Sequence, residues 1–239
     1  MKTGNISSVE TMALVDGPGV RFVVFMQGCN LRCTYCHNPE TWLINTGTSY
    51  TTTQLVNYIL KYQDYFKNSN GGVTFSGGEP LLQSDFLLDV CKELKKHDIH
   101  TCLDTSGTGF NNNELLDYID LVLFDIKALK EDTYKNLTGA KINESLKFLD
   151  LCQQKKIPLW IRQVIIPGIN DNKDYIKDLT KFLKPLKYIE NIEILPYHNK
   201  AIEKYQKLNI PYRLKDIPNM NEEYCKNIEN KLKKDLGIN

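Results

Sequence analysis

Three cysteines stand close together early in the chain, in the stretch Cys29-Asn-Leu-Arg-Cys33-Thr-Tyr-Cys36-His37. Thiolate is a soft ligand that suits iron–sulfur clusters, zinc or copper. A 4Fe–4S cluster usually takes four cysteines, so a C-x3-C-x2-C loop would leave one iron open to another ligand. An open coordination position is typical of a catalytic metal site. The spacing therefore predicts a reactive metal centre held by Cys29, Cys33 and Cys36.

Two other classes of protein remain open at this point. Zinc could be bound by the three cysteines with His37 or a distant cysteine as the fourth ligand, which would make the chain a zinc-stabilised binding module. An iron–sulfur electron carrier would use the same loop without any further ligand. Disulfides are disfavoured because 7 Cys is an odd number and no secretory signal precedes them. The remaining cysteines lack ligand spacing and are expected to be ordinary thiols; they are Cys91, Cys102, Cys152 and Cys225.

The elements that must position this loop alternate between strands and helices. Apolar runs predict six strands, at residues 21–27, 73–76, 100–103, 120–126, 158–166 and 191–195. Helical periodicity predicts helices at about 51–67, 84–97, 113–118, 144–155, 173–183 and 222–236, the first opened by the capping box at Thr51 and Gln54. The segment 29–50 is expected to be a loop. Strands separated by helices indicate a parallel sheet with right-handed crossovers.

Polar motifs follow the carboxyl end of each predicted strand. In a barrel all of these ends meet at one mouth, whereas an open sheet would string them along an edge. The sequence therefore favours an α/β fold of the (β/α)6 type with parallel strands. With 239 residues and 41% apolar residues, one domain over 1–239 is expected, with a barrel core at about 15–200 and a C-terminal helix at about 221–236.

Three of these strand ends carry residues suited to bind a small charged ligand. Gly77 and Gly78, before Glu79, let a ligand approach the backbone closely; alone, this turn is a weak signal. Buried charges are costly unless they are paired or coordinate an ion. The hard oxygens of Asp104, Thr105 and Asp125 therefore suit a small cation, although a plain salt bridge with Lys127 would also satisfy Asp125.

Arg162 lies in the middle of an apolar strand, in Leu159-Trp-Ile-Arg-Gln-Val. A charge at such a position is expected to point into a polar cavity inside the barrel. We expect it to lie near a ligand carboxylate or a substrate peptide, and we therefore treat it as a candidate catalytic residue.

The motifs together resemble one family. The cysteine loop after a first strand is similar to the radical S-adenosylmethionine superfamily. The stretches Val15-Asp-Gly-Pro-Gly-Val-Arg-Phe22, Gln27-Gly-Cys29 and Tyr35-Cys-His-Asn38 resemble the activating enzymes of glycyl-radical enzymes. The resemblance covers about residues 6–198. It implies a partial, TIM-like (β/α)6 barrel with a lateral opening for a macromolecular substrate.

The resemblance also implies cofactors and the residues that bind them. Three cysteines would hold a 4Fe–4S cluster, and the amino and carboxylate groups of S-adenosylmethionine would chelate the fourth iron. A monovalent cation would lie beside the carboxylate, at Asp104, Thr105 and Asp125. Tyr35 and His37 would offer planar faces for the adenine, and His198 at the end of the last strand would contact the nucleoside. The full set of expected cofactor-binding residues is Tyr35, Cys36, His37, Gly77, Gly78, Glu79, Asp104, Asp125, Ile126, Lys127 and His198.

The implied reaction is the activation of a glycyl-radical enzyme. Reductive cleavage of S-adenosylmethionine would give methionine and 5′-deoxyadenosine, with the hydrogen taken from a backbone glycine of the partner. The absence of cysteines between Cys36 and Gly77 favours pyruvate formate-lyase over other glycyl-radical enzymes as that partner. Activases of anaerobic ribonucleotide reductase are shorter chains and fit less well.

The electron donor, other binding partners and cellular location can also be stated as expectations. Reduced flavodoxin or ferredoxin is implied as the electron donor. A net charge of +1, from 30 basic and 29 acidic residues, argues against a dedicated nucleic-acid binder. No run approaches the length of a membrane span, and no leader is visible, so a cytoplasmic protein is expected.

Overall fold

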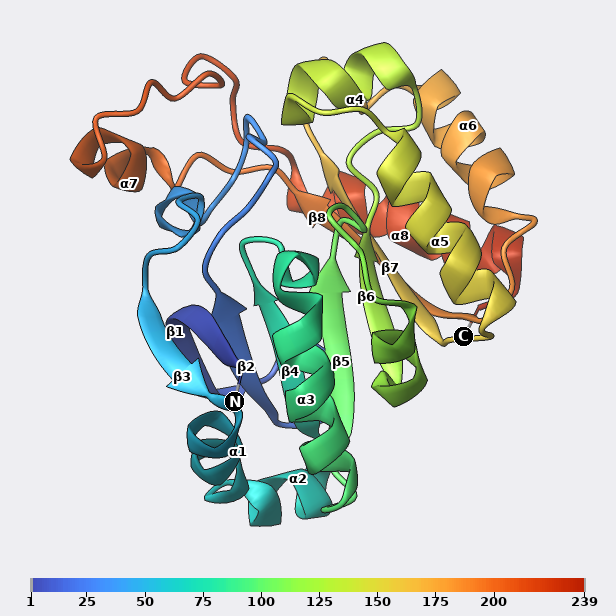
Figure 1. The fold of residues 1–239 in the computed structure, drawn as a ribbon. Helices are drawn as coiled ribbons and strands as arrows, with labels where there is room; N and C mark the ends of the chain where they lie inside the picture. Colours follow the sequence, from blue (N-terminus) through green and yellow to red (C-terminus); the bar gives the residue numbers. More distant parts are fainter. Residues whose placement is uncertain (1, 239) are drawn as a thin grey trace.

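The computed structural model describes residues 2–238. In this part of the chain one sheet has the strand order β3-β1-β2-β4-β5-β6-β7-β8 (Figure 1). The strands β2, β4, β5, β6, β7 and β8 pair in parallel with their neighbours in this order. They confirm the six predicted strands; their bounds are β2 Arg21–Met26, β4 Gly72–Gly77, β5 His100–Thr105, β6 Leu121–Asp125, β7 Leu159–Ile165 and β8 Ile189–Pro196.

The sheet curves but does not close, because β3 and β8 lie at its two ends. The predicted partial (β/α)6 barrel is confirmed in this form. Helices cover the outer face of the sheet, with α3 over the middle strands and α8 against β8 (Figure 1). The predicted long helices are confirmed to within a few residues, as α3 Ser84–Lys95, α5 Asn143–Gln154, α6 Lys173–Leu183 and α8 Glu222–Leu236.

Several elements differ from the sequence-based expectation. Strand β1 (Thr3–Ala13) was not predicted, and β3 (Thr48–Thr51) falls inside the expected loop. Both are antiparallel additions, in which β1 pairs with β2 and β3. Strand β3 has only four residues and none of them is buried, whereas β1 is long but alternates between exposed and buried residues. Neither strand has the continuous apolar run by which the parallel strands are recognised.

The helical expectation was also incomplete. The capping box at Thr51 and Gln54 is confirmed, but the helix predicted for 51–67 is split into α1 (Thr52–Leu60) and α2 (Gln63–Ser69). The predicted helix at 113–118 is the 3-10 helix η3 (Asn113–Tyr118). Four short elements were not predicted: η1 (Pro39–Thr41), η2 (Pro80–Gln83), α4 (Glu131–Thr138) and α7 (Ile202–Lys207). Six or eight residues carry too little periodicity to identify such helices.

The strands separate two apolar regions. On the outer face, Phe22, Val24 and Met26 of β2 belong to a large core shared with the covering helices. On the inner face a small cluster contains Cys102, Leu121 and Leu123, with Trp160 packed against it. The interior of a barrel is normally filled by such side chains. Most of the stabilising apolar area therefore lies between sheet and helices, and the interior keeps room for polar groups.

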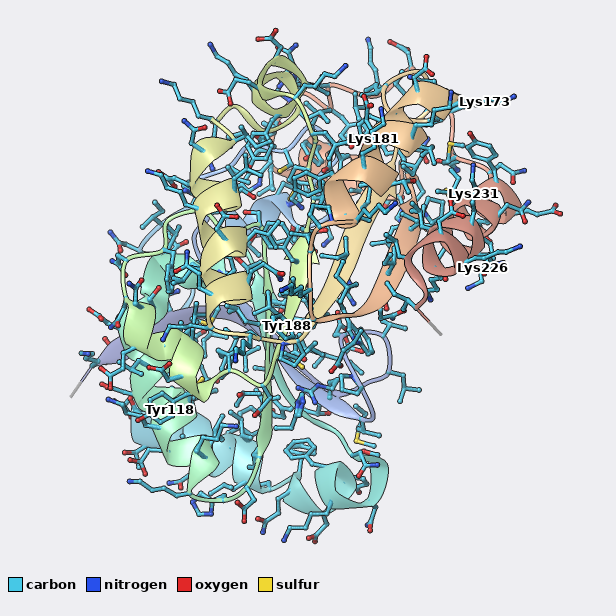
Figure 2. All side chains as sticks on the ribbon, turned by 90° about the vertical axis from the view of Figure 1, so that its right-hand side faces the viewer. Tyr118, Lys173, Lys181, Tyr188, Lys226 and Lys231 are labelled. Atoms are coloured by element: carbon cyan, nitrogen blue, oxygen red, sulfur yellow. The ribbon has the colours of Figure 1, made fainter. Side chains whose placement is uncertain are left out.

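The outer helices present lysines to solvent. Figure 2 shows Lys173 and Lys181 of α6 and Lys226 and Lys231 of α8 projecting from this side of the molecule. Within residues 2–238, no helix is long and apolar enough to cross a membrane.

Candidate active site

The cysteine loop begins where β2 ends. Two backbone hydrogen bonds attach its start to η1 and the residue after it, from Gly28 N–H to Thr41 O (2.8 Å) and from Cys29 N–H to Trp42 O (3.4 Å). Two more attach its middle to the end of α4, from Arg32 N–H to Thr138 O (2.7 Å) and from Thr34 N–H to Leu137 O (2.8 Å). The loop is therefore held on both sides by short helices that the sequence did not predict.

All three cysteines line one cavity of about 240 Å³. The walls come from the carboxyl ends of the parallel strands, as the convergence argument predicted. From the predicted set the lining includes Cys29, Cys33, Tyr35, Cys36, His37, Gly77, Gly78, Glu79, Asp104, Thr105, Asp125, Lys127 and Arg162. Residues remote in sequence thus meet at the mouth of the barrel.

Two predicted residues do not line this cavity. Ile126 belongs to the outer core, beneath the helices, and its N–H donates to Arg162 O at 2.8 Å. His198 lies next to the cavity rather than in its wall: its ring stacks on His37 with 4.1 Å between centroids. The pKa of His37 is lowered by burial and by the neighbouring His198, so the stacked pair favours neutral rings.

The cysteine side chains are suited to a metal rather than to free thiolate chemistry. None of them forms a disulfide, and Cys29 and Cys33 are buried. Burial raises the pKa of each of these two thiols to about 12. Without a metal they would remain protonated at neutral pH; a bound metal favours thiolate because metal binding displaces the thiol protons. The three thiols can therefore bind a positively charged metal group.

The residues of the alternative zinc site do not meet at one point. Within residues 2–238, no three His, Cys, Asp or Glu side chains converge closely enough to hold one metal ion, and these include Cys29, Cys33, Cys36 and His37. An iron–sulfur cluster is larger than an ion and does not require its cysteines to converge on one point.

Unpaired polar atoms also gather around the cysteine loop. The described residues contain five buried side-chain atoms without a hydrogen-bond partner, one of which is Thr52 Oγ1 on α1. The others lie in or against the loop: Thr34 within it, His198 on His37, Tyr134 in the cluster with Tyr35, and Tyr205 against Trp42. Buried polar groups are normally satisfied. None of these four residues lines the cavity itself, so the unpaired atoms lie around the cysteine loop rather than in the cavity wall.

Glu79 is turned away from the cavity centre, toward the end of β5. Its carboxylate accepts hydrogen bonds from Thr105 Oγ1 (2.5 Å), Ser106 N (3.0 Å), Ser106 Oγ (2.6 Å) and Leu81 N (3.2 Å). Burial raises the pKa of Glu79 to about 7, although these hydrogen bonds oppose the shift. The carboxylate thus joins the end of β4 to the turn after β5.

The adjacent glycine allows the cysteine loop to approach. A Cβ on Gly78 would lie 2.2 Å from Gly28 O, which no side chain tolerates. The same carbonyl oxygen, Gly28 O, accepts a hydrogen bond from Glu79 N–H (2.8 Å). The glycine therefore places the end of β4 directly against the residue that precedes Cys29.

The charged residues of the cavity pair with one another. Lys127 donates to Asp125 at 2.7 Å. Burial lowers the pKa of Lys127, but the combined attraction of Asp125, Tyr35 and Cys33 outweighs it, so the pKa is raised. Arg162 Nη1 lies 3.4 Å from Asp104 Oδ2, and Arg162 Nε donates to Glu193 at 2.7 Å. Burial raises the pKa of Asp104 to about 6, against the effect of Arg162. The carboxylates proposed for a cation are thus already paired with basic groups.

Other lining residues were not predicted. They include Trp42, Val164 and Leu195, together with Ser76, whose hydroxyl donates to Asp104 at 2.7 Å. Ser76 could have been identified, because it stands at the end of the predicted strand directly before the two glycines. The others have no pattern that separates them from core residues.

Comparison with known proteins identifies the family of this chain. The family model of the radical SAM superfamily matches residues 23–183. The pyruvate formate-lyase-activating enzyme of Clostridium pasteurianum is 47% identical over 98% of this chain and 98% of that protein. The enzyme of the same name from Staphylococcus epidermidis is 45% identical over 95% and 94%.

Solved structures resemble the fold. A domain of a pyruvate-formate lyase-activating enzyme from Bacteroides vulgatus matches 70% of this chain and 96% of its own, with a TM-score of 0.57 and 27% identity. SuiB of Streptococcus suis bound to precursor peptide SuiA matches 91% of this chain and 46% of its own, with a TM-score of 0.67 and 15% identity, which shows the fold alone. The chain belongs to the radical SAM superfamily and, within it, to the family of the pyruvate formate-lyase-activating enzymes.

Proposed function

We propose that this chain activates pyruvate formate-lyase by generating a glycyl radical in it, using S-adenosylmethionine and a 4Fe–4S cluster. The near full-length identity of 47% to an enzyme of that name carries the proposal. A bound cluster would supply the electron that cleaves the sulfonium, giving methionine and, after hydrogen abstraction from the partner's glycine, 5′-deoxyadenosine.

The cysteines are the proposed cluster ligands. Cys29, Cys33 and Cys36 each supply one thiolate and leave one iron for S-adenosylmethionine. Support comes from their shared cavity and from their C-x3-C-x2-C spacing. The hydrogen bond from Leu31 N–H to Cys29 Sγ (3.4 Å) already orients the first of these ligands.

The strand ends are the proposed binding site for the rest of the cofactor. Backbone groups of Gly77 and Gly78 receive its amino group, and Lys127 attracts its carboxylate. Tyr35 and the stacked His37–His198 pair offer flat faces for the adenosine end. Glu79 takes part indirectly, since its carboxylate is occupied by Thr105 and Ser106.

The cation, Arg162 and the electron donor are finer parts of the proposal. A monovalent cation at Asp104, Thr105 and Asp125 would have to share these carboxylates with Arg162 and Lys127. Arg162 itself acts by holding Asp104 rather than by facing the ligand as a free charge. Flavodoxin or ferredoxin remains the proposed electron donor, because the reaction consumes one electron for each cleavage.

The test is anaerobic reconstitution with iron and sulfide, followed by electron paramagnetic resonance of the reduced protein with and without S-adenosylmethionine. We expect a cluster signal that changes on addition of S-adenosylmethionine, then 5′-deoxyadenosine and a glycyl radical on added pyruvate formate-lyase. Cys33→Ser should lose the signal, whereas Cys225→Ala, on α8 away from the cavity, should keep it. A signal indifferent to S-adenosylmethionine would instead indicate an electron carrier.

Activation of a different glycyl-radical enzyme is the second candidate within this family. The reconstituted protein would then release 5′-deoxyadenosine but leave pyruvate formate-lyase without a radical. The names of the full-length relatives favour pyruvate formate-lyase.

A further inference from the structure

The interior of the barrel holds an arginine where an aliphatic side chain would be expected. Arg21, the first residue of β2, lies on the inner face and is fully buried. It sits at the amino ends of the strands, away from the cysteine loop, and it does not line the cofactor cavity. Desolvation of a guanidinium is costly, and burial lowers the pKa of Arg21. Such a residue needs strong compensating contacts.

Those contacts are uncharged. The guanidinium donates to Thr74 Oγ1 (3.0 Å), to Pro18 O (3.4 Å), and to the carbonyls of Val73 and His100, and it contacts the His100 ring at 3.3 Å. In the described part of the chain none of its hydrogen bonds goes to a carboxylate. The hydrogen-bond donors of the Arg21 guanidinium are therefore satisfied almost entirely by backbone carbonyls and a hydroxyl. In return, the arginine holds these groups in place.

One of the structures that it holds is the turn Val15–Gly19. Thr74 Oγ1, which accepts from Arg21, donates in turn to Asp16 O at 2.6 Å. Gly17 has φ +124°, and a Cβ there would lie 3.1 Å from Cys102 Sγ and 3.3 Å from Arg21 Nε. The turn thus enters the interior of the barrel and rests on β4, β5 and the arginine.

The opposite side of the same turn contacts the active site. Arg162 Nη2 donates to Val15 O at 2.6 Å, and Arg162 Nη1 lies 4.0 Å from Asp16 Oδ1. Arg162 lines both the cofactor cavity and a neighbouring groove that also contains Leu14, Val15 and Trp160. The turn is therefore clamped between two buried arginines, only one of which reaches the cavity.

We propose that Arg21, acting through Thr74, is a positioning residue for the active site. It fixes the turn Val15–Gly19 inside the barrel, so that Asp16 and the carbonyl of Val15 stay beside Arg162. Arg162 is then held in the orientation in which it pairs with Asp104 at the cavity wall. The role of Arg21 is thus to define the boundary between the cofactor cavity and the groove beside it.

The first test measures the turn itself and does not depend on the proposed function. Replacement of Arg21 could prevent folding, so the chosen variant is Thr74→Val, which keeps the side-chain volume and removes the link to Asp16. Its matched control is Thr101→Val on the adjacent strand, another fully buried threonine, whose hydroxyl donates to Tyr118 O instead. Hydrogen exchange of the metal-free chain is followed by mass spectrometry.

We expect Thr74→Val to speed exchange in residues 15–20 about tenfold, the effect of losing one buried hydrogen bond. Exchange in α3 and α5 should stay unchanged, and Thr101→Val should leave the turn protected. The same exchange in the turn for both variants and the wild type would overturn the proposal. So would a uniform rise over the whole sheet in Thr74→Val, which would mean a general structural role.

The second test rests on the proposed function and separates positioning from general stability. With reconstituted enzyme, Thr74→Val should raise the KM for pyruvate formate-lyase about tenfold, because the groove beside the turn is disturbed. Release of 5′-deoxyadenosine without the partner should fall much less, because the cysteines and Lys127 are not touched. An equal loss of both activities would contradict a positioning role. If the wild-type enzyme makes no glycyl radical, the proposed function fails while the exchange result still decides the role of Arg21.

Discussion

The buried carboxyl of Glu79 should make the stability of this protein depend on pH in a defined direction. Burial raises its pKa from the ordinary value of 4.5 to about 7 in the folded state. The folded chain therefore binds this proton more tightly than the unfolded chain does. The resulting stabilisation is fully present below about pH 4.5 and is lost as the pH rises through 7. Between pH 5 and 8 the loss amounts to about 2.5 kcal/mol, at 1.36 kcal/mol for each unit of pKa shift.

Glu79→Gln isolates this contribution, because the amide has nearly the same shape and does not titrate. Four hydrogen bonds now end on the carboxylate, two of them from the backbone N–H groups of Leu81 and Ser106. The hydroxyls of Thr105 and Ser106 can rotate to accept from the new NH2 group, but a backbone N–H cannot. The variant should therefore be less stable at pH 5 by about 1–3 kcal/mol, the cost of one unsatisfied buried donor.

The assay is urea unfolding of the metal-free protein at pH 5, 6, 7 and 8. Because other groups also titrate, the measured quantity is the difference in unfolding free energy between variant and wild type. That difference should shift in favour of the variant by about 2.5 kcal/mol from pH 5 to 8. Glu223→Gln, an exposed residue in the first turn of α8, serves as the control and should show a constant difference. A constant difference for Glu79→Gln as well would refute the argument.

Three further outcomes follow from contacts in and around the site. Gly78→Ala should lower iron incorporation severely, measured as iron per chain after reconstitution, because its Cβ would meet Gly28 O. Gly168→Ala is the control: its φ of +73° strains its own turn, but its Cβ would meet no atom within 4 Å, so it should incorporate iron normally. Lys127→Met should weaken S-adenosylmethionine binding at least about tenfold by calorimetry, since it leaves Asp125 unpaired; unchanged affinity would exclude Lys127 from the site. Leu87 is fully buried on α3, so Leu87→Ala should lower the free energy of unfolding, measured in urea, by about 2–5 kcal/mol. A loss below about 1 kcal/mol would mean that the core closes the space left by the leucine side chain.

The parallel part of the fold could be predicted from the sequence because its signals are strong. Strands such as β6 are continuous apolar runs, since both faces are buried. Long helices such as α3 carry clear periodicity. By contrast, β1 alternates between exposed and partly or fully buried residues, so it has no apolar run. Its pairing with β2 depends on contacts between two strands, and such contacts cannot be predicted from the pattern of residues within one strand.

The same distinction applies to the active site. The sequence places each polar residue at the end of a strand, and the parallel topology then brings these ends together without further information. The sequence cannot decide where each side chain points after that. Glu79 was expected to bind the cofactor; it lines the cavity, and its carboxylate accepts hydrogen bonds from Thr105 and Ser106. Ile126 was expected at the site, yet its side chain alternates to the outer face of the sheet.

Charged residues in the barrel show why such details depend on the whole fold. Arg21 and Arg162 lie on strands at opposite sides of the sheet, and no spacing in the sequence connects them. They are linked only because the turn Val15–Gly19 enters the barrel and offers carbonyl oxygens to both. Each arginine is costly to bury alone, and each is stabilised by contacts with the turn and with polar groups of neighbouring strands. An arginine at the start of a strand is therefore a useful signal in this fold, because its burial requires polar partners from elsewhere in the chain.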